Sequence, residues 1–301
     1  MTQGVLLVSH GTVDDLDDLE SFVTRVRRGR PPSPELISEL RRRYLAIGGR
    51  SPLNSINGVL ASKLGRRLGI PVAWASRLAP PFVRDVLVGL VDRGIQQVAV
   101  VPLAQHSAAV YAAGARASAD GLSVELACAG NWGREPRLSE AFARRIAAAL
   151  RGDDAAEPSA LLLTAHSLPL SVISAGDAYE EEMRASARDV VASLGEKAAD
   201  LPVLLAFQSQ GLASEAPGGW LGPDIAQALD ELHARGGRRV VVAPIGFLAD
   251  HVEILYDLDI EARRLAADRG MIYVRSASLN SDDDLVEVLA EVAVRTLAHT
   301  G

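Results

Sequence analysis

Eight short apolar segments recur along the 301-residue chain, separated by longer stretches with helical periodicity. Apart from Glu125, they are continuously apolar rather than alternating, which is typical of strands in a parallel sheet covered on both faces. Strand followed by helix, repeated, favours a doubly wound α/β fold. The predicted strands are Val5–Val8, Val72–Ala75, Val98–Val101, Val124–Ala127, Ala160–Leu163, Val203–Ala206, Val240–Ala243 and Ile272–Val274.

Apolar residues at helical spacing predict helices between these strands. The main predicted helices are Pro34–Ile47, Asn57–Leu68, Leu138–Leu150, Tyr179–Leu194, Asp224–Arg235 and His251–Arg269.

The two halves of the chain resemble each other at two places. Residues 4–10 and 160–166 each read as a buried strand that ends in a histidine, His10 and His166. Residues 93–102 and 235–244 share an Arg-Gly pair, an apolar strand and a closing proline. We interpret this as two similar Rossmann-like lobes with parallel sheets facing across a cleft, where ligands lie beyond the carboxyl ends of the strands.

The polar segment 151–158 contains Gly152 and Pro158 and follows a predicted helix, so we predict the linker there. The expected domains are 1–150 and 151–301, with the last helix packing back on the first lobe. Two domains suit a length of about 150 residues each.

Composition excludes several classes of protein. The chain is 48% apolar and 23% charged, so it can bury a sizeable core. It has 31 basic and 38 acidic residues, a balance poorly suited to nucleic acid, which requires a basic footprint. The only cysteine, Cys128, excludes an internal disulfide and a cysteine-ligated iron–sulfur cluster. No signal peptide or membrane span is recognisable, and we expect a cytoplasmic monomer.

Common catalytic motifs are missing. No glycine-rich phosphate loop and no HExxH sequence occurs, and Phe207 replaces the first glycine of a nucleophile elbow around Ser209. What remains is a set of histidines and carboxylates. His166 follows a strand and precedes a defined loop, where it is either a hydrogen-bonded structural residue or a functional one. For His106, a structural role is the favoured interpretation.

Three carboxylates follow one another at intervals of four residues on the helix predicted over 251–269. Glu253, Asp257 and Glu261 would form a row along one face, which is either solvated or a path of hard oxygen ligands for a divalent cation. We expect Asp250 to cap this helix and apolar residues elsewhere on it to pack. Those apolar residues are Val252, Leu255 and Ile260.

Arginines cluster at 25–30. Such a cluster is either a solvated surface or a rim that binds carboxylates, because the arginine fork matches a carboxylate bidentately.

Four segments, in this order, resemble the ferrochelatases, which insert ferrous iron into a porphyrin. They are Thr164-Ala165-His166-Ser167-Leu168-Pro169, Phe207-Gln208-Ser209, Trp220-Leu221-Gly222-Pro223-Asp224 and residues 246–257. The N-terminal segments 27–30 and 43–53 are most similar to the soluble coproporphyrin III ferrochelatases.

The resemblance implies the roles of individual residues. His166 and Glu253 would be catalytic and would touch the metal, and Asp257 and Glu261 would relay metal or protons. Arg27 and Ser51 match positions near the porphyrin carboxylates. Iron would be a substrate, and no resident cofactor is expected.

One residue departs from the soluble relatives, which usually carry a tyrosine where this chain has His10. A histidine there is similar to the smaller sirohydrochlorin and cobalt chelatases, so we expect His10 to bind metal and porphyrin. Two alternatives therefore stay open beside iron insertion into coproporphyrin III or protoporphyrin IX. One is a sirohydrochlorin or cobalt chelatase, and the other is a non-catalytic haem- or tetrapyrrole-binding protein.

Overall fold

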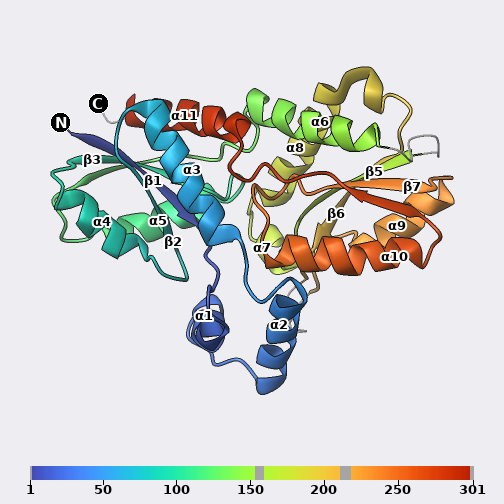
Figure 1. Cartoon of the computed structure of the whole chain (residues 1–301), viewed down its shortest axis with the longest axis horizontal. Helices are drawn as coiled ribbons and strands as arrows, with labels where there is room; N and C mark the ends of the chain where they lie inside the picture. Colours follow the sequence, from blue (N-terminus) through green and yellow to red (C-terminus); the bar gives the residue numbers. More distant parts are fainter. Residues whose placement is uncertain (1, 153–158, 211–217, 299–301) are drawn as a thin grey trace. The chain divides into compact units, whose positions relative to one another are not determined.

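The computed structural model describes residues 2–152, 159–210 and 218–298, which form two units. The first unit comprises Met1–Trp132 together with Asn280–Gly301, and the second comprises Gly133–Leu279. Each unit contains one four-stranded parallel sheet with helices packed on it (Figure 1).

The sheet of the first unit has the strand order β2-β1-β3-β4. Its strands are β1 (Gln3–Ser9), β2 (Val72–Ser76), β3 (Gln97–Pro102) and β4 (Glu125–Cys128). The last helix of the chain belongs to this unit, where it contacts α3 and β3. The helices of the unit are η1 (Leu16–Asp18), α1 (Leu19–Val26), α2 (Pro34–Ala46), α3 (Leu53–Leu68), α4 (Val83–Val91), α5 (Ala108–Ser118) and α11 (Asp283–Ala298).

The sheet of the second unit has the order β6-β5-β7-β8, which repeats the topology of the first. Its strands are β5 (Ser159–His166), β6 (Val203–Gln208), β7 (Arg239–Ala243) and β8 (Ile272–Arg275). The helical segments of this unit are α6 (Pro136–Leu150), α7 (Leu170–Ser174), α8 (Tyr179–Leu194), η2 (Gly195–Ala198), α9 (Ile225–Ala234), η3 (Glu253–Ala262) and α10 (Arg263–Ala267).

All eight predicted strands are confirmed, and so is the parallel α/β class. The strands that resemble each other in sequence also occupy the same places in the two sheets: β1 corresponds to β5, and β3 to β7. Their apolar character follows from this placement, because β1, β3, β5 and β7 are the inner strands and are buried on both faces.

The division of the structure differs from the predicted boundary at 150/151. Helix α6 belongs to the second unit, where it packs against α8, and the units divide between Trp132 and Gly133. Trp132 is buried in the first unit, and its indole donates to the carbonyl of Pro102. The polar segment that suggested a linker lies largely outside the described residues, because 153–158 are among those not described.

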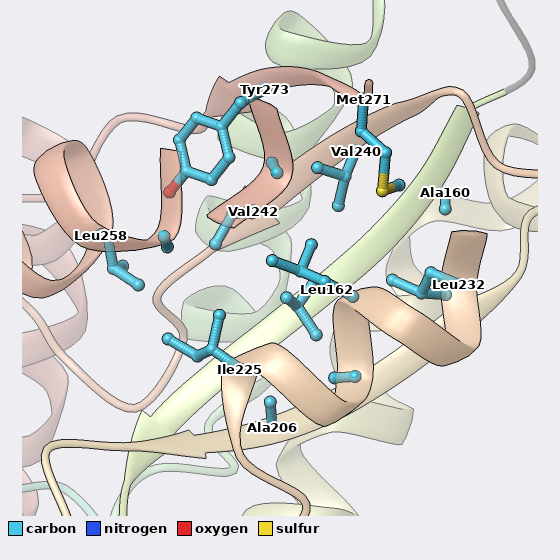
Figure 2. Close-up of a cluster of buried hydrophobic side chains, with 14 of the residues drawn as sticks. Ala160, Leu162, Ala206, Ile225, Leu232, Val240, Val242, Leu258, Met271 and Tyr273 are labelled. Atoms are coloured by element: carbon cyan, nitrogen blue, oxygen red, sulfur yellow. The ribbon is translucent and has the colours of Figure 1, made fainter. Parts of the chain in front are cut away.

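The core of the second unit explains the position of the acidic segment. Ile254, Leu258 and Ala262 project from η3 into a cluster that includes Leu162 and Val242 of the sheet (Figure 2). These three residues follow one another at intervals of four, so they anchor one side of η3. The carboxylates Glu253, Asp257 and Glu261 are each one residue earlier and therefore form an adjacent row.

The predicted helix over 251–269 is present, but its first part is wound differently. Residues 253–262 form a π-helix, and an α-helix begins only at Arg263. In π winding each hydrogen bond spans five residues instead of four, so the faces of the segment shift relative to an α-helix. The prediction that Ile260 packs is wrong: Ile260 is exposed, because it lies opposite the side of the helix on which Ile254 and Leu258 are buried.

Two glycines are required where strands end. Gly11 follows β1 with φ +105°, and a Cβ there would lie 3.0 Å from the Cβ atoms of Ser76 and Ala79. Gly246 follows β7, and its Cβ would lie only 2.6 Å from Cα and Cβ of Ala165. Both glycines therefore allow loops to pack closely beside a strand end that delivers a histidine.

No helix in the described parts of the chain has the length and apolar character needed to cross a membrane.

Candidate active site

His166 is the last residue of β5, and its position is fixed by its neighbours in the chain. Its register partner is Gln208 at the end of β6, and the next amide, Ser167 N, donates to Gln208 O at 2.8 Å. The Ser167 hydroxyl donates to Leu221 O at 2.8 Å, and the amide of Leu221 donates to Leu168 O at 2.9 Å. The loop after His166 is thus bonded on both sides, which limits the movement of the imidazole.

Tyr179, the first residue of α8, supports the same strand end. Its hydroxyl donates to the backbone carbonyl of His166 at 2.9 Å, while its amide donates to the Asp177 carboxylate. Burial, the first cause, and the nearby Glu253 carboxylate raise the pKa of Tyr179. The phenol therefore stays protonated and remains a hydrogen-bond donor to the His166 carbonyl.

Glu253, the first residue of η3, meets two histidines. Its Oε2 lies 3.1 Å from Nδ1 of His166 and 3.8 Å from Nε2 of His251. Burial would raise the pKa of Glu253, but the two imidazoles outweigh it and hold that pKa well below its usual value. Burial likewise lowers the pKa of His166, and the Glu253 carboxylate reverses the shift and raises it. The pair is therefore a carboxylate beside an imidazole of increased basicity.

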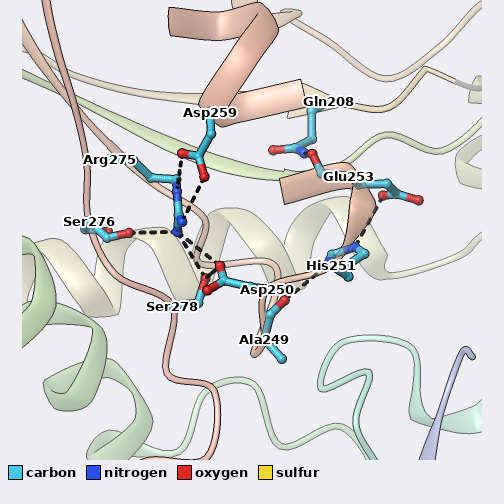
Figure 3. A network of polar contacts seen from close by, with 9 residues as sticks. All are labelled: Gln208, Ala249, Asp250, His251, Glu253, Asp259, Arg275, Ser276 and Ser278. Carbon is cyan, nitrogen blue, oxygen red and sulfur yellow. Dashed lines mark hydrogen bonds and ion pairs between the residues drawn. The ribbon is translucent and has the colours of Figure 1, made fainter. Parts of the chain in front are cut away.

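The hydrogen bonds assign the protons. An ionised carboxylate only accepts, so Nδ1 of His166 donates to Glu253, and Nε2 of the neutral ring keeps a lone pair. Both nitrogens of His251 face acceptors, because its Nδ1 lies 3.0 Å from Ala249 O (Figure 3). Burial lowers the pKa of His251 and its acceptors raise it, with a net increase. His251 thus suits the imidazolium form, and His166 suits a proton acceptor.

Asp257, one turn along η3, is tied to the end of β6. The hydroxyl of Ser209 donates to Asp257 Oδ2 at 2.5 Å, and Nε2 of Gln208 donates to Glu253 O at 3.4 Å. Ser209 itself has φ +57°, a conformation uncommon outside glycine, which aims its side chain at η3. The structure therefore brings His166, Glu253 and Asp257 together in the second unit, with Glu261 further along η3 and partly exposed.

The acidic row is not a closed metal cage. Among the residues that the structure describes, no group of three or more His, Cys, Asp and Glu side chains is arranged to hold a metal ion.

Asp250 was expected to cap the helix, and this prediction is wrong. The N-cap residue of η3 is Val252, and no side chain caps it. The Asp250 carboxylate instead accepts from Ser278 Oγ at 2.7 Å and pairs with Arg275 at 3.2 Å (Figure 3).

The remaining predicted site residues belong to the first unit. His10 is exposed directly after β1, and its ring lies edge-to-face with Phe22 at 6.3 Å. Arg27 ends α1, and its Nε is buried without a hydrogen-bond partner among the described residues. Ser51 is buried, and its hydroxyl accepts from the amide of Leu53 at the start of α3.

Several residues of the site were not predicted. His251 and Ser209 lie inside segments that carried the family resemblance, so their proximity in sequence to Glu253 and Phe207 was a usable signal. Tyr179 ends the loop after His166 that was singled out in the sequence, although no role was predicted for it. Arg275 lies outside the motifs and reaches the site only through the fold.

Two solved structures of a chelatase have the same fold. The chain is similar to the sirohydrochlorin chelatase SirB from Bacillus subtilis, whose structure with Fe3+ gives a TM-score of 0.61 at 16% identity. That comparison covers 100% of this chain and 97% of the other, and at such identity it establishes the fold alone. The fold is therefore that of an α/β protein with two similar units, as in this chelatase.

Sequence comparison is more specific. The sequence model of the ferrochelatase family matches residues 2–297. A ferrochelatase from Herpetosiphon aurantiacus is 33% identical, with 96% of this chain and 97% of the relative covered. A coproporphyrin III ferrochelatase from Geobacillus thermodenitrificans is 32% identical, with 100% of this chain and 98% of the relative covered. The chain belongs to the ferrochelatase family and is an enzyme, a porphyrin metal chelatase of the lyase class.

Proposed function

We propose that the enzyme inserts Fe²⁺ into coproporphyrin III, with His166 and Glu253 as its catalytic residues. The observation that carries this proposal is the hydrogen bond between His166 and the ionised Glu253 carboxylate. The reaction exchanges Fe²⁺ for the two N–H protons of the ring, so it needs a base and a metal contact but no redox cofactor. The cytoplasm, whose reducing conditions suit a single free cysteine, is the compartment that we propose.

His166 can serve both needs of this exchange. The lone pair on Nε2 accepts a pyrrole proton, and a neutral imidazole is also a borderline ligand for Fe²⁺. Glu253 stabilises the imidazolium that forms, because its charge lies next to Nδ1. We assign Asp257 and Glu261 to the passage of metal or protons along η3, since their oxygens are ligands that iron and protons share.

The preference for coproporphyrin III rests on carboxylate recognition. Coproporphyrin III has four propionates, two more than protoporphyrin IX, so added cationic contacts favour it. Arg27 has a buried Nε without a partner among the described residues, and Arg28 and Arg30 beside it are exposed. Relatives named coproporphyrin III ferrochelatase also match this chain at full length. We assign Arg27 to the propionates and Ser51 to the turn that shapes the same region before α3.

An anaerobic metallation assay tests the substrate. Fe²⁺ is mixed with coproporphyrin III, protoporphyrin IX or sirohydrochlorin, and metallation is followed by absorbance for the wild type and Arg27→Gln. We expect the highest kcat/KM with coproporphyrin III and a loss in the variant of about 10- to 150-fold, which corresponds to one hydrogen bond to a charged group of about 1.5–3 kcal/mol. Arg235→Gln, which removes an arginine that pairs with Glu231 on α9, is the matched control and should leave kcat/KM unchanged.

Faster metallation of protoporphyrin IX would reject the coproporphyrin preference but keep the reaction. Metallation of sirohydrochlorin alone would favour the alternative chelatase. If no tetrapyrrole were metallated, the enzyme would have to be reconsidered as a tetrapyrrole-binding protein.

We also propose that His10 ligates the iron of the product haem. His10 is exposed at the carboxyl end of β1, next to the glycine turn, so its imidazole is accessible to a bound ring. We expect His10→Ala to shift the Soret band of the haem complex, whereas His233→Ala on α9 leaves it unchanged. An unshifted spectrum for His10→Ala, at saturating coproporphyrin haem, would show that another group binds the iron.

A further inference from the structure

We propose that Arg275 is a positioning residue for the reaction, because its guanidinium fastens two points of the segment that carries His251, Glu253 and Asp257. Arg275 is the last residue of β8, and its hydrogen bonds and ion pairs join it to residues other than these three. Its effect on rate rests on the proposed function, whereas its effect on the geometry of the segment does not.

The first point of attachment is Asp259, within η3. Nε of Arg275 lies 2.6 Å from Asp259 Oδ1, and Nη2 lies 3.0 Å from Oδ2 (Figure 3). This is a bidentate pair with two parallel hydrogen bonds, which fixes orientation as well as distance. Asp259 is therefore held against the end of the sheet in one rotational position.

The second point of attachment is Asp250, before η3. Nη1 of Arg275 lies 3.2 Å from Asp250 Oδ1, and the same oxygen accepts from Ser278 at 2.7 Å. Nη1 also donates to the Ser276 carbonyl at 3.3 Å. The Arg275 side chain is only 14% exposed, so solvent screens these contacts less than those of a surface pair.

The two attachments together select the winding of the segment. Asp250 precedes Glu253 by three residues, and Asp259 follows it by six, so one guanidinium spans the start of η3. With 3.6 residues per turn, an α-helix would rotate Asp259 further around the axis than the wider π winding does. Asp259 would then lose its hydrogen bonds to the Arg275 guanidinium, which also pairs with Asp250. The clamp formed by Asp250, Arg275 and Asp259 therefore favours the π winding that places the Glu253 carboxylate beside His166.

A fixed carboxylate matters for the rate, because a small displacement of a catalytic group is costly. Groups that orient metal-binding or catalytic side chains typically change activity by about 10- to 100-fold when they are removed. We expect kcat of Arg275→Gln to fall by about this factor. The KM for porphyrin should stay within about twofold, because the residues assigned to the propionates belong to the other unit. Arg275→Lys keeps the charge but loses the fork, so its loss should be smaller.

The matched control is Arg269→Gln. Arg269 also pairs through Nε with an aspartate of the second unit, Asp230 at 2.7 Å, but that pair links α10's end to α9 rather than to η3. Its kcat should be unchanged within twofold. Asp250→Asn weakens the clamp without removing Arg275, and it replaces Arg275→Gln if that variant does not fold.

A second readout does not require activity. The imidazole ¹⁵N resonances of His166 and His251 at pH 7.5 respond to the contacts of these rings with Glu253, and they should move in Arg275→Gln but not in Arg269→Gln. Unchanged resonances together with unchanged kcat would overturn the proposal. A fall in kcat with unchanged resonances, accompanied by an equal fall in Arg269→Gln, would show a general loss of stability and would also overturn it. If the wild type metallated no tetrapyrrole while the resonances moved, the proposed function would fail and the positioning role would stand.

Discussion

His166→Ala is expected to lower kcat for iron insertion by about 10²- to 10⁴-fold, the usual contribution of a positioned general base. The variant loses the lone pair that accepts the pyrrole proton, and it leaves the Glu253 carboxylate without its closest partner at 3.1 Å. The neighbouring imidazole of His251 cannot substitute, because both of its nitrogens face acceptors. The measurement is the initial rate of anaerobic Fe²⁺ insertion into coproporphyrin III, followed by absorbance at saturating substrates.

His233→Ala is the control for this experiment, since His233 lies on α9 of the same unit and takes no part in the site. Its rate should equal that of the wild type. Glu253→Gln tests the pair from its other side: the amide is nearly isosteric but cannot stabilise an imidazolium, so it should lower kcat as well. Activity in His166→Ala comparable to that of the wild type would remove His166 from the mechanism.

Much of the fold was predictable because the buried strands consist almost entirely of apolar residues. Val5–Val8 and Ala160–Leu163 are apolar on every residue, which only an inner strand of a covered parallel sheet requires. The internal repeat was visible for the same reason, since β1 and β5 have the same place in equivalent sheets. The position of an inner strand can thus be predicted from its own residues in a single sequence.

The winding of η3 was not predictable in this way. Residues 253–262 have carboxylates and apolar residues that both recur at intervals of four, and this spacing fits an α-helix and a π-helix about equally well. What distinguishes the two are contacts from distant residues: Ser209 with Asp257, and Arg275 with Asp259. The choice between them is therefore made by tertiary structure.

In the candidate site, too, some residues were predictable from local sequence and others depend on tertiary contacts. His166 and Glu253 were recognised from motifs, and the fold places them within hydrogen-bond distance although 87 residues separate them. Tyr179 and Arg275 act on the site through a backbone carbonyl and through a helix, respectively. Neither mode of action leaves a spacing pattern in the sequence, because the partner group can belong to any residue that the fold brings near.

The first unit is expected to lose stability in acid because of His106. This histidine follows β3, is 4% exposed, and was expected to be structural; burial lowers its pKa from 6.5 to about 4. Between pH 6.5 and 4 the unfolded chain therefore protonates His106, whereas the folded chain does not. The contribution of neutral His106 to the free energy of unfolding is fully present above pH 6.5 and is lost as the pH falls toward 4. At 1.36 kcal/mol for each pKa unit, the loss is about 2 kcal/mol by pH 5 and about 3 kcal/mol by pH 4.

Urea unfolding of the wild type and His106→Gln at pH 7.5 and pH 5 measures this contribution. Glutamine is polar but does not titrate, so the free energy of unfolding should fall between the two pH values by about 2 kcal/mol less in the variant than in the wild type. Other groups titrate in both proteins, among them the carboxylates paired with arginines, and their effects cancel in this difference. His233→Gln, on a partly exposed residue of α9, should keep the wild-type dependence. Equal pH dependence in His106→Gln and the wild type would mean that His106 takes up its proton in the folded state, and that the acid sensitivity of the protein arises elsewhere.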